Sequence, residues 1–468
     1  MTTMRIILLI LISSFIVKNS EAQNDQYIGT WLGHLKGPLT NLRIALHISE
    51  KEGVLLTKLD SPDQFSFGNA ANKTTLDQEG IHIDFPLMGA KYVGQMSNDS
   101  LVGTFYQNGT ETPLNLGRFE GEILPPARPQ TPKAPFNYSS KDVVIKTKDD
   151  KVKLAGTLTI PKGKGPFPAA ILVSGSGPQD RDEYLMGHRP FHVIADYLTR
   201  NGIAVLRYDD RGVGKSTGVF ATATSFDFAD DAEAAHSFLK KQSKIDKTKV
   251  GIIGHSEGGL IAPIVASRKS DVGFIILLAG PSVSGRDIII DQQELIMLAS
   301  GEDSLEVQKT KQSSIQVMDF IAENHTKENL VDLLATKIEE LNKELNAEIP
   351  KAYSPKSYAR QVAFSFGSGW MKTFILTNPQ DYLTKTNCPI LALYGEKDLQ
   401  VSVRANEEQM RKVLDGKEKS EVVVFKNLNH LFQHADLGIP SEYQAIEETI
   451  SVDVLQKMTS WIKDLMTK

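Results

Sequence analysis

The stretch from Val250 to Leu260 constrains the fold of this chain more than any other, because it joins an apolar strand to a helix through a very short turn. Its centre reads Gly254-His255-Ser256-Glu257-Gly258, a G-x-S-x-G pattern. The two glycines let strand and helix approach closely, and the serine between them takes a strained backbone conformation. Since the helix begins just after Ser256, free N–H groups lie beside its hydroxyl. A plain capping serine is the alternative interpretation.

Apolar runs and amphipathic segments alternate on both sides of this turn, which predicts an α/β fold with a mostly parallel sheet flanked by helices. The predicted strands are 169–173, 204–208, 250–253, 274–278, 390–394 and 421–425, preceded by a hairpin over 143–161. Their continuous apolar character is typical of a sheet covered on both faces. From about residue 285 to 380 long polar helices replace the strands, so we expect a helical insertion that forms a lid.

The first third of the chain has a different organisation. Residues 1–22 combine a basic start, an apolar run and the small-residue pattern Ser20-Glu21-Ala22, which predicts a secretory signal peptide and an exported protein. Residues 25–123 contain short alternating runs separated by Gly and Asn turns, which predict an antiparallel β domain, a barrel or a sandwich. Residues 124–136 are rich in proline and predict a stiff linker, and residues 137–468 form the α/β domain.

Composition excludes several classes of protein. The net charge of −5 gives no basic surface for nucleic acid, and after signal cleavage we expect no integral membrane span. The single cysteine, Cys388, excludes an intramolecular disulfide and a cysteine-cluster zinc site. A metal site from His34, His47 and His82 would need all three to meet, and we expect no metal and no cofactor. The sequence leaves the oligomeric state open, with a homodimer as one expectation.

A serine nucleophile needs a general base, and the base needs an acid to orient it. Asp398 follows the strand 390–394 and His430 follows the strand 421–425, so both should reach the same edge of the sheet as Ser256. The order Ser, Asp, His is the order expected with this turn. Glu396 is the alternative acid and His434 the alternative base.

An oxyanion hole requires backbone N–H donors. We predict the N–H of Glu257, directly after the nucleophile, and the N–H of Ser176 in the loop Ser174-Gly175-Ser176-Gly177-Pro178. The segment Gly212-Val213-Gly214-Lys215-Ser216 is similar to the end of a phosphate-binding P-loop, but Asp209 stands where that motif needs its first glycine. An ATPase is therefore not expected.

These segments together resemble the α/β-hydrolase superfamily, and closely its bacterial esterase and serine-aminopeptidase-like branch. The similarity covers about residues 140–468 and rests on five segments: 174–182, 209–216, 254–259, 394–401 and 428–432. It implies an α/β-hydrolase fold with a helical lid, and a carboxylic-ester hydrolase that works through an acyl-enzyme. The lid departs from the branch at Gly369-Trp370-Met371-Lys372, where relatives often carry Pro-Trp-Phe-Arg.

Trp370 is the predicted substrate-binding residue, as a wall of the acyl pocket, and a lid-core aromatic is the alternative. The expected partner is a small-molecule ester of small or medium acyl length. A serine peptidase acting on short peptides is the second hypothesis, and it would need carboxylates such as Asp180 or Asp182 to hold the substrate ammonium. A non-catalytic binding protein, in which the β domain does the work, is the third.

Overall fold

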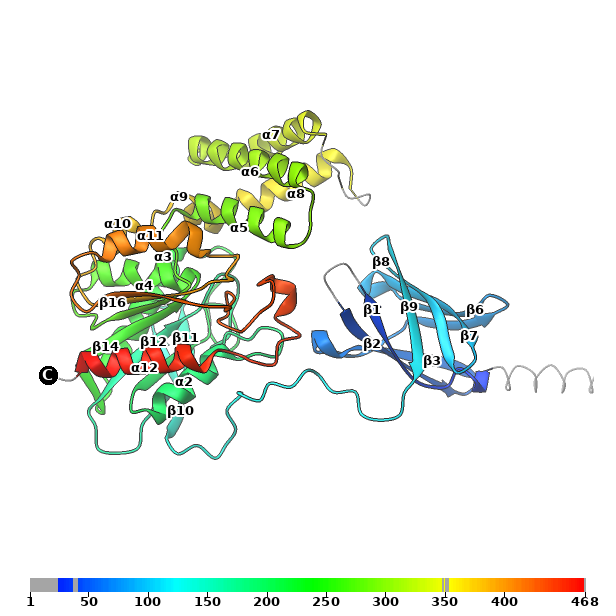
Figure 1. Cartoon of the computed structure of the whole chain (residues 1–468), viewed down its shortest axis with the longest axis horizontal. Helices are drawn as coiled ribbons and strands as arrows, with labels where there is room; N and C mark the ends of the chain where they lie inside the picture. Colours follow the sequence, from blue (N-terminus) through cyan, green and yellow to red (C-terminus); the bar gives the residue numbers. More distant parts are fainter. Residues whose placement is uncertain (1–23, 37–40, 347–348, 350–352, 467–468) are drawn as a thin grey trace, which may run out of the picture. The chain divides into compact units, whose positions relative to one another are not determined.

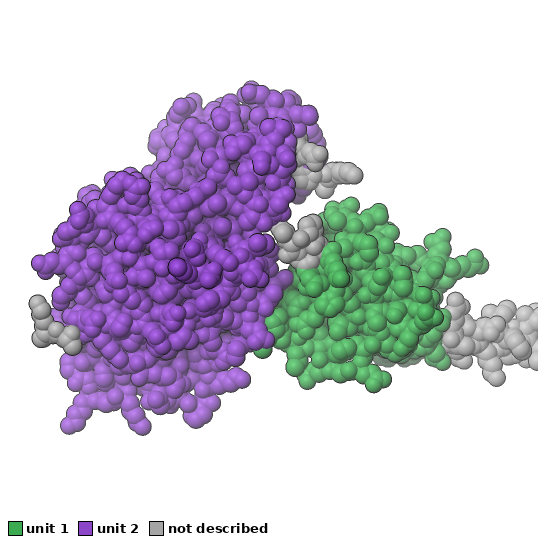
Figure 2. Space-filling model, in the orientation of Figure 1, with its two compact units in different colours: residues 1–127 green, residues 128–468 purple. Residues whose placement is uncertain are grey.

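The protein divides into two compact units, Met1–Ala127 and Arg128–Lys468 (Figure 2). The structure is a computed structural model, and it describes residues 24–36, 41–346, 349 and 353–466. The division falls inside the proline-rich segment 124–136, and the predicted signal peptide lies outside the described residues. In the described part of the chain, no helix has the length and apolar character needed to cross a membrane.

The first unit is one antiparallel sheet that curls back on itself (Figure 1). Within the described residues the strands pair in the order β4-β3-β2-β1-β9-β8-β7-β6-β5. Their bounds are β1 Gly29–Lys36, β2 Asn41–Lys51, β3 Val54–Ser61, β4 Ser66–Ala70, β5 Lys73–Asp77, β6 Gly80–Phe85, β7 Ala90–Ser97, β8 Ser100–Gln107 and β9 Thr110–Arg118. Across the two ends of this order, the Thr74 hydroxyl donates to the Thr57 hydroxyl at 2.9 Å. The predicted antiparallel β domain is confirmed, and it takes the barrel-like form.

Alternation along these strands gives the first unit its own core. Trp31 and Tyr92 are its largest fully buried side chains, and the Trp31 indole N–H donates to the Tyr27 carbonyl at 2.8 Å. The three histidines of this unit find separate partners. His47 contacts Thr30 and Asp60, His34 contacts Asn41 and His82 contacts Asp77. Among the described residues, no three metal-ligating side chains form a group.

The second unit contains the mixed sheet expected from the alternating pattern (Figure 1). Its strands lie in the order β10-β11-β13-β12-β14-β15-β16-β17, and all neighbours from β13 to β17 are parallel. The predicted leading hairpin is β10–β11, which is antiparallel. The bounds are β10 Ser139–Lys146, β11 Lys153–Ile160, β12 Phe167–Val173, β13 Ala204–Tyr208, β14 Ile245–His255, β15 Ile275–Leu278, β16 Ile390–Gly395 and β17 Glu421–Phe425.

Helices cover both faces of this sheet, which explains why its strands are continuously apolar. The helices α2 (Pro190–Arg200) and α12 (Val452–Met466) pack on each other, while α3 (Ser225–Lys240) and α4 (Glu257–Arg268) pack together over β12 and β14. Helix α11 (Val403–Leu414) lies against β16 and β17.

The helical insertion lies between β15 and β16 and rises over one edge of the sheet in Figure 1. Its helices are α5 Gly285–Ala299, α6 Ser304–Asn324, α7 Leu330–Glu344, α8 Pro355–Phe366, α9 Gly369–Leu376 and α10 Gln380–Leu383. It has a small core of its own that includes Met318, Ile321 and Leu334. The chain enters this lid through α5, after β15, and leaves it through α10, before β16.

Candidate active site

The turn at Ser256 has the strained geometry that the sequence predicts. Strand β14 ends at His255, α4 begins at Glu257, and Ser256 between them has φ 53° and ψ −117°, which is unfavourable for a residue with a Cβ atom. A Cβ atom on Gly254 would lie 2.0 Å from the Gly258 carbonyl oxygen, and one on Gly258 would lie 2.1 Å from the Val173 carbonyl oxygen. Both glycines are therefore required by close backbone contacts.

Asp398 and His430 meet at the carboxyl edge of the sheet. The distance from His430 Nδ1 to Asp398 Oδ2 is 2.8 Å, and both side chains are buried. The other carboxylate oxygen of Asp398 accepts the N–H groups of Gln400 and Val401 at 2.8 and 2.9 Å. Because Asp398 carries no proton to donate when ionised, Nδ1 of His430 holds the ring proton and Nε2 is left as the basic nitrogen.

The alternative acid and base have other partners. The Glu396 carboxylate accepts the Asn427 N–H at 2.9 Å, and His434 contacts Glu448 at 2.8 Å near the surface. Neither side chain is hydrogen-bonded to the Asp398–His430 pair. The geometry therefore favours Asp398 and His430 over Glu396 and His434.

The loop after β12 lies directly against the serine. A Cβ atom on Gly175 would be 3.1 Å from the Cβ atom of Ser256. The Gly175 N–H is already used, because it donates to the Glu183 carboxylate at 2.9 Å. Ser176 is exposed, and within the described residues its N–H has no hydrogen-bond acceptor. The N–H of Glu257, at the first position of α4, has no acceptor within the helix.

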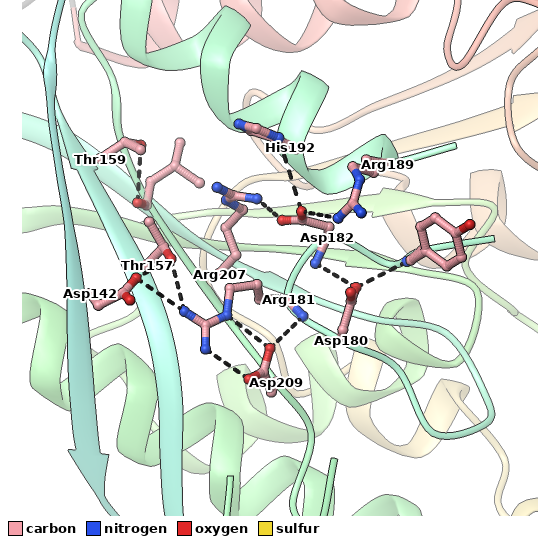
Figure 3. Close-up of polar contacts among 12 residues, drawn as sticks. Asp142, Thr157, Thr159, Asp180, Arg181, Asp182, Arg189, His192, Arg207 and Asp209 are labelled. Atoms are coloured by element: carbon pink, nitrogen blue, oxygen red, sulfur yellow. Dashed lines mark hydrogen bonds and ion pairs between the residues drawn. The ribbon is translucent and has the colours of Figure 1, made fainter. Parts of the chain in front are cut away.

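Charged residues after this loop hold it to the edge of the sheet, as Figure 3 shows. Arg181 forms a two-pronged contact with Asp209, with distances of 2.8 and 2.7 Å, and also reaches Thr157 at 2.9 Å. Asp182 accepts from Arg207 and from Arg189, the latter at 2.8 Å. These side chains therefore brace the loop, and their charges are already paired.

Asp209 also explains the segment that is similar to a P-loop. Its carboxylate accepts the Lys215 N–H at 3.0 Å, and its backbone carbonyl accepts the Ser216 hydroxyl at 2.7 Å. A Cβ atom on Gly214 would lie 2.7 Å from the Asp209 carboxylate. Gly214 and the Lys215 N–H thus form part of a tight turn that is closed by Asp209.

The side chain of Glu257 links the turn to the lid. It is buried, and its Oε1 accepts the Ser225 hydroxyl at 2.6 Å and the Trp370 indole N–H at 2.8 Å. Burial raises the pKa of Glu257, and these two hydrogen bonds oppose the rise. Trp370, on α9, stacks on Phe374 with ring centroids 5.4 Å apart. The predicted wall residue is thus hydrogen-bonded to the residue that follows Ser256.

The family model described as "Serine aminopeptidase, S33" matches residues 188–434, which is more than half of the chain. The chain belongs to this S33 serine aminopeptidase family. The matched range contains Ser256, Asp398 and His430. Together with the sheet order, the match confirms that this S33 chain is an α/β-hydrolase.

Individual relatives of this S33 chain include an esterase. Esterase EstD of Thermotoga maritima is 25% identical over 405 residues, which are 85% of this chain and 78% of that protein. An uncharacterized protein of Mycobacterium tuberculosis is 27% identical over 139 residues, 30% of this chain and 45% of that protein. Among solved structures, the Pyrococcus furiosus esterase Pf2001 has a TM-score of 0.41 at 18% identity, over 70% of this chain and 93% of that chain.

Three residues around the site of this S33 chain were not predicted from the sequence. Glu183 and Ser225 lie outside the predicted site motifs, and a turn of this kind is expected to point the His255 side chain away from the serine. In the structure His255 contacts Glu183 and the His430 carbonyl. His255 lies within the G-x-S-x-G motif, but its partners lie 72 and 175 residues away along the chain. No local sequence pattern predicts such contacts.

Proposed function

We propose that the chain is a serine carboxylic-ester hydrolase that acts on small or medium acyl esters through Ser256, His430 and Asp398. The observation that supports this most is the 2.8 Å contact between Asp398 and His430, with the His430 backbone tied to the residue before Ser256. The strained backbone of Ser256 adds support, because strain of this kind clusters at functional sites.

In the proposed reaction, the Ser256 hydroxyl attacks the ester carbonyl while Nε2 of His430 takes its proton. Asp398 keeps the ring in the required tautomer and stabilises the imidazolium. The tetrahedral intermediate then collapses, the proton passes from His430 to the leaving alcohol, and an acyl group remains on Ser256. Water, deprotonated by His430, attacks the acyl carbonyl, and the second tetrahedral intermediate collapses to the carboxylic acid while His430 returns the proton to the Ser256 oxygen.

The N–H groups of Ser176 and Glu257 would stabilise the oxyanion of both tetrahedral intermediates. Engagement of the Gly175 N–H by Glu183 supports the choice of Ser176 over its neighbour. Each such donor contributes about two to three orders of magnitude in rate.

The choice of ester over peptide has two supports. EstD, which matches most of the chain, is named an esterase. Two of the carboxylates that a peptidase could use for the substrate ammonium, the lid glutamates aside, also have partners: Asp182 is paired with Arg207 and Arg189, and Asp180 accepts backbone N–H groups. The family description, serine aminopeptidase, favours the peptidase as the second candidate. In either case we propose that Trp370 bounds the acyl side of the pocket.

The test compares two substrate classes on the purified protein. We expect hydrolysis of p-nitrophenyl esters of short and medium chains, and slower turnover of aminoacyl-p-nitroanilides. Ser256→Ala should abolish ester hydrolysis, while Ser267→Ala, which removes a hydroxyl bonded within α4, should retain it. Ester hydrolysis that survives Ser256→Ala would exclude the proposed nucleophile, and faster amide turnover would favour the peptidase.

A further inference from the structure

His255 is a buried imidazole whose two ring nitrogens both face hydrogen-bond acceptors. Nδ1 lies 2.8 Å from the Glu183 carboxylate, and Nε2 lies 3.0 Å from the backbone carbonyl oxygen of His430. A carbonyl oxygen can only accept, so Nε2 must carry a proton. The same Glu183 oxygen accepts the Gly175 N–H at 2.9 Å, as a carboxylate oxygen does. When the Glu183 carboxyl is ionised it can only accept, so both nitrogens of His255 donate, and a ring with two N–H groups is an imidazolium.

The surroundings of His255 are suited to a positive charge. Glu183 comes from the loop after β12, and its side chain is 7% exposed against 9% for His255. From the other side, the His430 ring lies with its centroid 4.8 Å from that of His255, and Asp398 lies behind it. Burial by itself lowers the pKa of His255, but the Glu183 and Asp398 carboxylates and the two hydrogen bonds outweigh it, so the pKa is raised above its ordinary value.

The pair connects the three chain segments that the proposed reaction needs. Glu183 holds the Gly175 N–H, and Gly175 packs on Ser256. His255 precedes Ser256 in the turn and holds the carbonyl of His430. Glu183 has φ 52°, which is unfavourable for a residue with a side chain, so the surrounding contacts must hold it there.

We propose that Glu183 and protonated His255 form a buried ion pair. This pair positions the loop of residues 174–178 (the oxyanion loop), Ser256 and His430 relative to one another. This inference rests on the proposed function for its effect on rate, but not for the charge of His255. Neither residue touches the substrate in the proposal, so both are positioning residues.

The ion pair predicts a pH dependence with a defined sign. Since the pKa of His255 is raised in the folded protein, the pair is complete below that pKa and is lost as the pH rises through it. A neutral ring has one N–H, so either Glu183 or the His430 carbonyl would then face a bare nitrogen lone pair. We therefore expect kcat to fall on the alkaline side.

The direct test is nuclear magnetic resonance of the histidine ring nitrogens in the full chain, with no substrate present. We expect both nitrogens of His255 to stay protonated to a higher pH than in an ordinary imidazole, and one of them to lose its proton at a lower pH in Glu183→Gln, because a lost carboxylate shifts such a pKa by about 1–3 units. The signal is assigned by its loss in His255→Gln or, if that variant does not fold, by its shift in Glu183→Gln. A His255 ring in the unmodified chain that loses its proton at or below the pH of an ordinary imidazole would overturn the proposal.

The second readout is the pH profile of kcat for a p-nitrophenyl ester. In Glu183→Gln, the fall of kcat on the alkaline side should begin at a pH that is lower by at least about one unit. The matched control is Glu448→Gln, which removes the carboxylate of the exposed His434–Glu448 pair and should leave that pH unchanged. A Glu183→Gln profile parallel to that of the unmodified chain would mean a merely structural contact and would overturn the proposal. Absent ester hydrolysis would refute the proposed function alone, because the resonance experiment needs no turnover.

Discussion

At the scale of the residue, Asp210 is a buried acid near Ser256 whose protonation state follows from its surroundings. Burial raises the pKa of Asp210 to about 8, against the lowering effect of hydrogen bonds from the Gln179 N–H and the Ser174 hydroxyl. The carboxylates of Glu257 and Glu183 add to the rise. Asp210 is therefore largely protonated at neutral pH, which avoids several buried negative charges under the oxyanion loop.

This protonation predicts how stability changes with pH. The unfolded chain releases the Asp210 proton near pH 3.8 and the folded chain at about pH 8, so the contribution to stability is present at low pH and is lost as the pH rises to about 8. Asp210→Asn has no proton to lose. Between about pH 6 and pH 8, its free energy of unfolding should therefore fall by about 2 kcal/mol less than that of the unmodified chain.

Urea unfolding at the two pH values measures this difference. Asp209→Asn is the control, because the pKa of Asp209 is lowered by its contacts with Arg181 and the Lys215 N–H, so that it is ionised throughout this window. Equal pH slopes for Asp210→Asn and the unmodified chain would contradict the assignment.

The strand order allows the position of single residues to be predicted from the sequence, while their catalytic roles stay a prediction. Asp398 and His430 each follow a parallel strand, and they meet as expected. The contacts of Glu183 with His255, and of Glu257 with Ser225, could not be predicted, because they depend on how long loops close over the sheet. Periodicity carries no information on such loops.

At the scale of the element, long apolar strands and amphipathic helices could be predicted from the sequence, whereas a helix cap and two short strands could not. The sequence predicts a helix over 225–241 with Ser225 as its cap, but the helix is Ser225–Lys240, Thr224 is the cap, and its partner Asp227 completes a capping box. Strands β4 and β5 were not predicted, because Gly68 and polar residues interrupt their apolar alternation. Their place in the sheet comes from pairing with β3 and β6.

Two of the contacts that hold the lid to the rest of its unit lie close to the proposed triad. Trp370 on α9 donates to Glu257. On α5, Asp291 accepts from Ser402 at 2.5 Å and from Arg404 at 2.6 Å, next to the segment that holds Asp398. The lid is thus attached beside the nucleophile and beside the acid of the proposed triad.

Trp370→Phe tests the first of these contacts. The ring remains, but the buried Glu257 loses one donor, which costs about 1–3 kcal/mol of stability. We also expect KM for medium-chain esters to rise by more than KM for acetate esters. Trp461→Phe is the control, because it removes an indole N–H bonded to the Lys419 carbonyl, remote from the lid. Identical KM values for all chain lengths in Trp370→Phe would exclude a role in substrate binding.

At the scale of the whole molecule, each unit has a core of its own. The β unit buries a cluster around Trp31, and the hydrolase unit buries one around its parallel sheet. The segment after Ala127 belongs to the hydrolase unit: Arg128 donates to the Met186 and Gln444 carbonyls, and Gln130 donates to the Ile450 carbonyl. Part of the predicted linker is therefore hydrogen-bonded to the hydrolase unit.

A fragment of residues 128–468 should accordingly fold and hydrolyse p-nitrophenyl acetate with kcat close to that of the full chain. A fragment that begins at residue 137 lacks the Arg128 and Gln130 contacts and should melt at a lower temperature, because backbone carbonyls near Ile450 lose their donors. Thermal unfolding and ester kinetics on both fragments check this. Loss of activity in the longer fragment would show that the β unit is needed for catalysis.

The central claim, that Ser256 forms an acyl-enzyme, is tested most directly by covalent trapping. Diethyl p-nitrophenyl phosphate phosphorylates an activated serine, and mass spectrometry locates the adduct. We predict one adduct, on the peptide that contains Ser256, formed in step with the loss of esterase activity and absent in Ser256→Ala. An adduct on another residue, or full inactivation with Ser256 unmodified, would contradict the account.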